Sequence, residues 1–140
     1  VDKLLRAGLT VDAGPVLVTG ATGGVGSIAI VLLKQLGFDV TAVTGKTEQT
    51  EFLLQLGAKQ VIDREALTVG TDKALLKPQW AGVVDTVGGD ILFNAVKSLQ
   101  YGASAACCGL TAGIDFKGKK AGIVSCLIKR IYFTFKCLSV

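Results

Sequence analysis

Val16-Leu-Val-Thr-Gly-Ala-Thr-Gly-Gly-Val-Gly26 sets the architecture of this 140-residue sequence. An apolar run breaks into clustered glycines, and the run that follows, Ser27-Ile-Ala-Ile-Val-Leu-Leu33, is apolar again. This order is typical of a strand, a tight turn and a helix N-terminus, arranged so that a diphosphate can bind between them. The sequence therefore predicts a dinucleotide-binding turn, with a glycine-rich turn that binds no ligand as the alternative.

The glycines of this turn have distinct expected roles. Gly20 and Gly23 allow the sharp bend of the backbone. Gly24 lets the backbone approach the diphosphate, and Gly26 lets the helix pack closely on the strand. The residues of this turn that we expect to bind the cofactor are Thr19, Gly20, Thr22, Gly23, Gly24, Val25 and Gly26.

Beyond the turn, strand patterns alternate with helix patterns. Strands are expected at about 16–19, 39–43, 60–62, 81–85, 104–108 and 131–135, and helices at about 24–36, 47–56, 90–99 and 122–129, with shorter ones within 1–12 and 65–79. This alternation predicts one domain over 1–140 with an α/β fold, a Rossmann-type doubly wound six-stranded parallel sheet. With the strands numbered in sequence order, the expected order is 3-2-1-4-5-6, and ligands bind such sheets at the carboxyl ends of the strands.

The segment that leaves the second expected strand favours NADPH over NADH. A site for NAD places an acidic residue about 20 residues beyond the glycines, where it accepts a hydrogen bond from the ribose 2′-hydroxyl. That position holds Thr44-Gly45-Lys46, which supplies a hydroxyl, a flexible backbone and a cation that suit a 2′-phosphate. Arg64 is a further candidate for the adenine or the phosphate. The alternatives are an ordinary loop lysine and a surface arginine.

Two further glycine turns follow the fourth and fifth expected strands. We expect the backbone of Thr86, Val87 and Gly88, and that of Cys108, Gly109 and Leu110, to hold the nicotinamide ring and its carboxamide. Simple turn glycines are the alternative. Asp85, at the end of the fourth expected strand, is interpreted as a turn or helix-capping carboxylate rather than an acid or base.

The sequence identifies no catalytic residue. It contains no histidine, which excludes a mechanism in which this chain supplies a histidine base. Its four cysteines, Cys107, Cys108, Cys126 and Cys137, show no Cys-x-x-Cys spacing, so we expect no metal site. Reduced cysteines, no visible secretory signal and no apolar helical run near the roughly 20 residues that a bilayer needs predict a cytoplasmic protein with no membrane partner.

Positive charge is concentrated at the C-terminal end. Residues 1–115 carry nine Lys and Arg against eleven Asp and Glu, whereas residues 116–140 carry six Lys and Arg and no acid. These cations suit a nucleic acid, an acidic lipid or the phosphates of a CoA substrate. We interpret them as a solvated edge of the domain, with no nucleic-acid partner.

Two patterns fit a rival family, the short-chain dehydrogenases. Their Thr-Gly-x-x-x-Gly-x-Gly matches the first turn, and their catalytic Tyr-x-x-x-Lys matches Tyr132-x-x-x-Lys136. That pair belongs on a long helix with a serine before it. Here Lys119 and Lys120 occupy the preceding region and the segment 131–135 has the composition of a strand, which argues against a catalytic Tyr132.

Several ordered stretches together resemble one family. They are Gly14-Pro-Val-Leu-Val-Thr-Gly-Ala-Thr-Gly-Gly-Val-Gly-Ser27, Ala42-Val-Thr-Gly-Lys46, Leu56-Gly-Ala58, Val61-Ile-Asp-Arg64, Trp80-Ala-Gly-Val-Val-Asp-Thr-Val-Gly-Gly89 and Ala106-Cys-Cys-Gly-Leu110. On these residues, about 10–116 resembles the nucleotide-binding domain of the medium-chain dehydrogenase/reductase superfamily. The resemblance is closest to the zinc-independent quinone oxidoreductase group that includes the acryloyl-CoA reductases.

The resemblance implies an NADPH-dependent reductase that transfers hydride to a quinone or to the activated double bond of an acyl-CoA. It also implies a homodimer joined at the last strand of this domain. Two departures limit these expectations. Residues 117–140 have less family character, and the family's catalytic domain, built from sequence on both sides of this one, has no counterpart here. A non-catalytic NADP(H)-binding redox-sensor module therefore stays open as an alternative.

Overall fold

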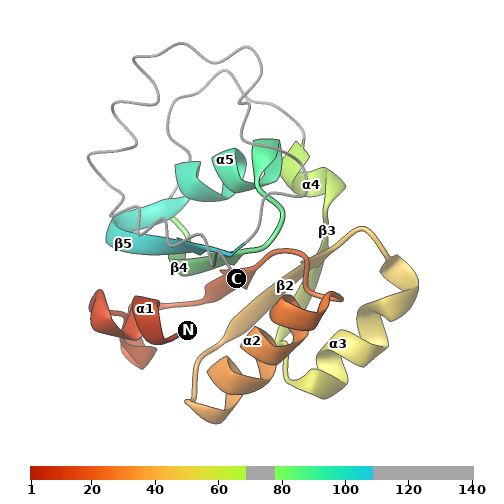
Figure 1. The fold of residues 1–140 in the computed structure, drawn as a ribbon, viewed down its shortest axis with the longest axis horizontal. Helices are drawn as coiled ribbons and strands as arrows, with labels where there is room; N and C mark the ends of the chain where they lie inside the picture. Colours follow the sequence, from red (N-terminus) through yellow and green to blue (C-terminus); the bar gives the residue numbers. More distant parts are fainter. Residues whose placement is uncertain (69–77, 109–140) are drawn as a thin grey trace, which may run out of the picture.

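A five-stranded parallel sheet forms the centre of the described part of the chain (Figure 1). The computed structural model describes residues 1–68 and 78–108. Its strands are β1 (Val16–Val18), β2 (Val40–Thr44), β3 (Gln60–Asp63), β4 (Trp80–Asp85) and β5 (Leu99–Cys107). They follow the order β3-β2-β1-β4-β5, and every neighbouring pair is parallel. The predicted Rossmann-type fold and strand order are confirmed for these five strands, whereas the sixth expected strand lies outside the described residues.

Helices cover both faces of this sheet. As Figure 1 shows, α2 (Gly24–Gln35) and α3 (Thr50–Leu56) lie on one side, and α4 (Glu65–Thr68) and α5 (Gly89–Lys97) lie on the other. The remaining elements are α1 (Asp2–Arg6) and two single 3-10 turns, η1 (Val11–Ala13) and η2 (Thr47–Gln49). This cover on both sides is what parallel strands with helical crossovers require. None of the described helices combines the length and the apolar character needed to cross a bilayer.

The fifth strand begins at Leu99, earlier than the expected start at 104. Trp80 of β4 pairs with Leu99, whereas Gly82 pairs with Ser104, so β5 has extra residues opposite this part of β4. Gly102 lies in the irregular segment. The polar and glycine residues of this segment interrupt the alternation by which a strand is recognised, and the expected helix over 90–99 ends at Lys97 instead.

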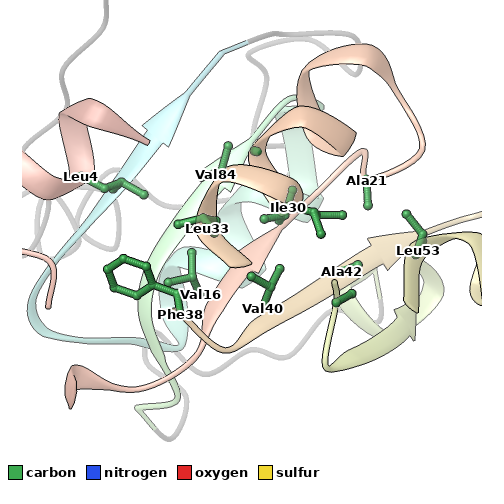
Figure 2. Packing of buried hydrophobic residues seen from close by; sticks show 13 residues of the cluster. Leu4, Val16, Ala21, Ile30, Leu33, Phe38, Val40, Ala42, Leu53 and Val84 are labelled. Carbon is green, nitrogen blue, oxygen red and sulfur yellow. The ribbon is translucent and has the colours of Figure 1, made fainter. Parts of the chain in front are cut away.

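Side chains of the strands pack into two hydrophobic cores, one on each face of the sheet. Val16 and Val18 of β1 belong to the core beneath α2, whereas Leu17 belongs to the core beneath α5. Figure 2 shows Ile30 and Leu33 of α2 directed into the first core. Both are fully buried, and burial of such a side chain stabilises the fold by about 1.5–3 kcal/mol. This packing holds the N-terminus of α2 beside the carboxyl end of β1.

Candidate functional site

A cleft of about 230 Å³ lies at the carboxyl edge of the sheet. Residues at or after the ends of four strands meet there, because the carboxyl ends of parallel strands share one edge. The lining residues are Thr19, Gly20, Thr22, Val43, Thr44, Gly45, Lys46, Arg64, Val87 and Ile91. The cleft therefore brings together side chains that are far apart in the sequence.

The glycines of the first turn differ in what the fold requires of them. Gly20 has φ +59°, in the left-handed region that favours glycine. A Cβ on Gly26 would lie 2.9 Å from the Cα of Ala21 and closer still to the carbonyl oxygen of Gly20, so Gly26 is needed for close packing. A Cβ on Gly24, in contrast, would have no atom of the described residues within 4 Å beyond those of its own helix and chain neighbours. The fold itself therefore gives no reason for glycine at position 24.

The N-terminus of α2 adjoins this turn. Gly23 is the N-cap residue, so within the described residues α2 starts without a side-chain cap, and its first turn holds no acidic residue. The first N–H groups of a helix lack partners within the helix and carry partial positive charge. This end of α2 can thus receive an anion through its backbone.

Two cations gather where β2 and β3 end. The Lys46 N–H donates a hydrogen bond to Thr44 Oγ1 (3.0 Å), and the Arg64 N–H donates one to the Thr44 carbonyl (2.9 Å). A Cβ on Gly45 would lie 3.0 Å from Arg64 Cζ, so the guanidinium group rests against the Gly45 backbone. Both cationic side chains are exposed, and neither forms a salt bridge with an acidic residue in the part of the chain that the structure describes.

A buried hydrogen-bond network joins the ends of β1 and β4. Thr19 Oγ1 donates to Asp85 Oδ1 (2.7 Å) and accepts from the Thr86 N–H (3.1 Å). Thr86 Oγ1 donates to the Thr19 carbonyl (3.0 Å), and the Gly88 N–H donates to Asp85 Oδ2 (2.8 Å). Thr19 and Asp85 are both fully buried. The interpretation of Asp85 as a turn carboxylate is confirmed by these contacts.

Burial controls the titration of the acidic groups at this edge. It raises the pKa of Asp85, although the hydrogen bonds from Thr19 and Gly88 act in the opposite direction. Burial, with a smaller contribution from the Asp85 charge, raises the pKa of the Cys107 thiol to about 12. The neighbouring Cys108 donates its N–H to the Asp85 carbonyl (2.7 Å), which ties the end of β5 to β4. Neither thiol is activated as a nucleophile, since burial raises the pKa of Cys108 as well.

The predicted site residues gather at one edge of the sheet. Those that line the cleft are Thr19, Gly20, Thr22, Thr44, Gly45, Lys46, Arg64 and Val87. Gly23, Gly24, Val25 and Gly26 form the start of α2, Thr86 and Gly88 lie in the turn after β4, and Cys108 follows β5. Gly109 and Leu110 lie outside the described residues, as do Tyr132, Lys136 and the cationic tail. Cofactor contact by these residues stays a prediction.

Two lining residues were missed. Val43 precedes Thr44 at the end of β2, and Ile91 follows the glycine turn that opens α5. Their apolar character indicated core positions, and only their place next to predicted binding residues could have pointed to the cleft. In the described ranges 1–68 and 78–108, no three His, Cys, Asp or Glu side chains form a group that could hold a metal ion.

Comparison of the sequence with known proteins identifies relatives of this chain. Residues 24–134 match the family described as zinc-binding dehydrogenase. The Bacillus subtilis protein YhfP, named provisionally as a quinone oxidoreductase, is 52% identical over 113 residues, which are 81% of this chain and 34% of YhfP. The acrylyl-CoA reductase AcuI of Ruegeria pomeroyi is 43% identical over 124 residues, 89% of this chain and 37% of AcuI. The chain therefore spans about a third of the length of these relatives.

Solved structures show the same fold. Escherichia coli K-12 YhdH, crystallised with bound NADPH, has a TM-score of 0.82 and 37% identity, over 93% of this chain and 39% of YhdH. Bacillus subtilis YhfP, crystallised with bound NAD, has a TM-score of 0.80 and 49% identity, over 84% of this chain and 36% of YhfP. Both nicotinamide dinucleotides thus occur among the bound ligands of similar structures.

Proposed function

This chain belongs to the zinc-binding dehydrogenases, within the medium-chain dehydrogenase/reductase superfamily, and we propose that it is the NADPH-binding domain of an oxidoreductase. The proposed reaction is hydride transfer from NADPH to a quinone or to the activated double bond of an enoyl-CoA. When bound, the cofactor supplies the hydride, and the protein supplies binding, orientation and electrostatics.

The open position at Gly24 carries this proposal. A glycine on the first turn of a helix lowers helix stability relative to alanine, so it needs a reason. Among the described residues, no atom outside its own helix and chain neighbours lies within 4 Å of its missing Cβ, so packing does not supply a reason. Close approach of a ligand to the backbone would supply that reason. Since α2 presents its N–H groups at this place without a side-chain cap among the described residues, the ligand group that fits is an anion such as a diphosphate.

Lys46 and Arg64 support a 2′-phosphate on the adenosine ribose. Arginine presents a planar fork of donors that suits phosphate oxygens, and lysine adds a second positive charge. Thr44 closes β2 at this place, so the position where an NAD site would carry an acid holds a hydroxyl, a glycine and a cation. These residues would therefore hold NADPH in preference to NADH.

The turn after β4 would receive the other end of the cofactor. Val87 lines the same cleft as the first turn, on its β4 side. Gly88 is the N-cap residue of α5, and its N–H donates a hydrogen bond to Asp85. These residues would orient the nicotinamide at the edge where the strand order reverses, which is where sheets of this kind bind their ligands.

Fluorescence titration of NADPH and NADH tests the cofactor assignment. We expect the chain to bind NADPH at least about tenfold more tightly, a difference of about 1.4 kcal/mol. Lys46→Ala and Arg64→Ala should each weaken NADPH binding and leave NADH binding nearly unchanged. Lys59→Ala is the matched control, because this exposed lysine pairs with Asp39 near the amino ends of β2 and β3. Equal affinities for the two dinucleotides, or no binding of either, would reject the assignment.

Turnover is tested separately from binding. A redox-sensor module would use the same cleft to bind NADP(H) without reducing a substrate. We expect the 140-residue chain to bind NADPH and to oxidise it slowly with a quinone or acryloyl-CoA. Efficient turnover of either substrate would reject the sensor alternative.

A further inference from the structure

The turns after β1 and β4 are built as one unit. Thr19 Oγ1 serves both as the donor to Asp85 Oδ1 (2.7 Å) and as the acceptor for the Thr86 N–H (3.1 Å). Asp85 uses its second oxygen to hold the Gly88 N–H (2.8 Å). One buried carboxylate therefore contacts β1 through Thr19 and the start of α5 through Gly88.

Contact between the two turns leaves no space between them. A Cβ on Gly20 would collide with Thr86 Oγ1 and would lie 3.2 Å from Val87 Cγ2. Because the β4 turn rests directly on the backbone of the β1 turn, a shift of Thr86 or Val87 changes the cleft at Gly20. The position of one turn thus sets the position of the other.

We propose that Asp85 is a positioning residue that fixes the Thr86–Gly88 turn against the first glycine turn and thereby sets the affinity for the nicotinamide half of the cofactor. This inference rests on the proposed function, in which that turn receives the nicotinamide. The adenosine half would bind at Lys46 and Arg64, which the network around Asp85 does not include. Loss of Asp85 should therefore affect the two halves unequally.

A carboxylate suits this task because it offers an acceptor on each oxygen. Asparagine offers only one acceptor, so Asp85→Asn leaves either Thr19 Oγ1–H or the Gly88 N–H without its acceptor. Thr19→Val keeps the side-chain shape and removes the hydroxyl, which deprives both Asp85 Oδ1 and the Thr86 N–H of their partner. Thr19→Ser keeps the hydroxyl and is the conservative counterpart.

The first test compares a whole cofactor with half of one. NADPH and adenosine 2′,5′-bisphosphate are titrated into the wild-type chain, Asp85→Asn and Thr19→Val. We expect each variant to lose about tenfold in NADPH affinity, the equivalent of about 1.4 kcal/mol, and to keep its affinity for the bisphosphate within about twofold. Equal losses for both ligands, or no loss for either, would overturn the proposal.

The second test needs no ligand. Amide hydrogen exchange followed by NMR should show faster exchange at Thr86 in Thr19→Val and at Gly88 in Asp85→Ala, which removes both acceptor oxygens, with amides of β2 unchanged, and Thr19→Ser should restore the protection at Thr86. Unchanged exchange at both amides would also overturn the proposal. A wild-type chain that binds neither ligand would reject the proposed function, and this exchange result would then decide on its own whether Asp85 holds the turn.

Discussion

Replacement of Gly24 by alanine should separate cofactor binding from folding. Gly24 is the first residue of α2, and its φ lies outside the left-handed region. In the described part of the chain, a Cβ there would meet no atom within 4 Å outside its own helix and chain neighbours. An alanine methyl group therefore fits the protein without strain. It would stand, however, where we propose that the diphosphate approaches the helix N-terminus.

The two expected effects have opposite signs. Alanine in place of glycine inside a helix gains about 0.5–1 kcal/mol, and a first-turn position gains less, so stability should stay equal or rise slightly. If the methyl group holds the diphosphate away from one backbone N–H, the complex loses a hydrogen bond to a charged group. Such a bond contributes about 1.5–3 kcal/mol, which corresponds to about a ten- to hundredfold loss of NADPH affinity.

Urea denaturation and fluorescence titration on the same preparation measure both effects. Gly26→Ala provides the contrast, because its methyl group would lie 2.9 Å from Ala21 Cα and should cost about 1–3 kcal/mol of stability through overpacking. Unchanged NADPH affinity in Gly24→Ala would refute the argument that the ligand explains this glycine. A large loss of stability in Gly24→Ala would refute the claim that the position is open.

Three further outcomes follow from the site. Gly45→Ala should displace the Arg64 guanidinium, since a Cβ there would lie 3.0 Å from its Cζ. It should therefore weaken NADPH binding about as much as Arg64→Ala does, and titration of both variants with NADPH measures this. Burial raises the pKa of Asp85 above 3.8, so the folded chain takes up this proton at higher pH than the unfolded chain. Wild type should therefore gain stability relative to Asp85→Asn as the pH falls from about 7 to about 4. A difference in the free energy of unfolding between the two, measured by urea denaturation, that stays constant over this range would contradict this. With a thiol pKa of about 12, Cys107 should react with iodoacetamide at least about tenfold more slowly at pH 8 than an ordinary cysteine, as peptide mass spectrometry can show.

The order of the sheet could be predicted because it depends on local patterns. Apolar runs separated by helical periods define parallel strands, and the glycines around Gly20 mark where the strand order reverses. The early start of β5 could not be predicted in this way. Its first residues pair with β4 through an irregular register around Gly102, and such a register depends on the neighbouring strand rather than on alternation within the segment.

The sequence could predict which segments line the cleft, but not the side-chain contacts that join them. Thr44, Lys46 and Arg64 could be identified because each follows an expected strand. The hydrogen bond between Thr19 and Asp85 joins residues 66 positions apart, and nothing in either local sequence indicates the pairing. Long-range side-chain contacts of this kind depend on how strands are placed side by side, so they become visible only in the folded chain.

The uncapped start of α2 links the stability of this protein to its ligand. A serine or aspartate in place of Gly23, the N-cap residue, would stabilise the helix by about a few tenths of a kcal/mol, yet it would occupy the place of the anion. The ligand-free chain thus lacks this stabilisation at the proposed anion site, and a bound diphosphate would supply it instead. At a concentration a hundred times its dissociation constant, a ligand that binds only the folded state adds about 2.7 kcal/mol. The cofactor would then act as the last structural element of the domain, and the supply of NADPH would set how much of the protein survives unfolding and degradation.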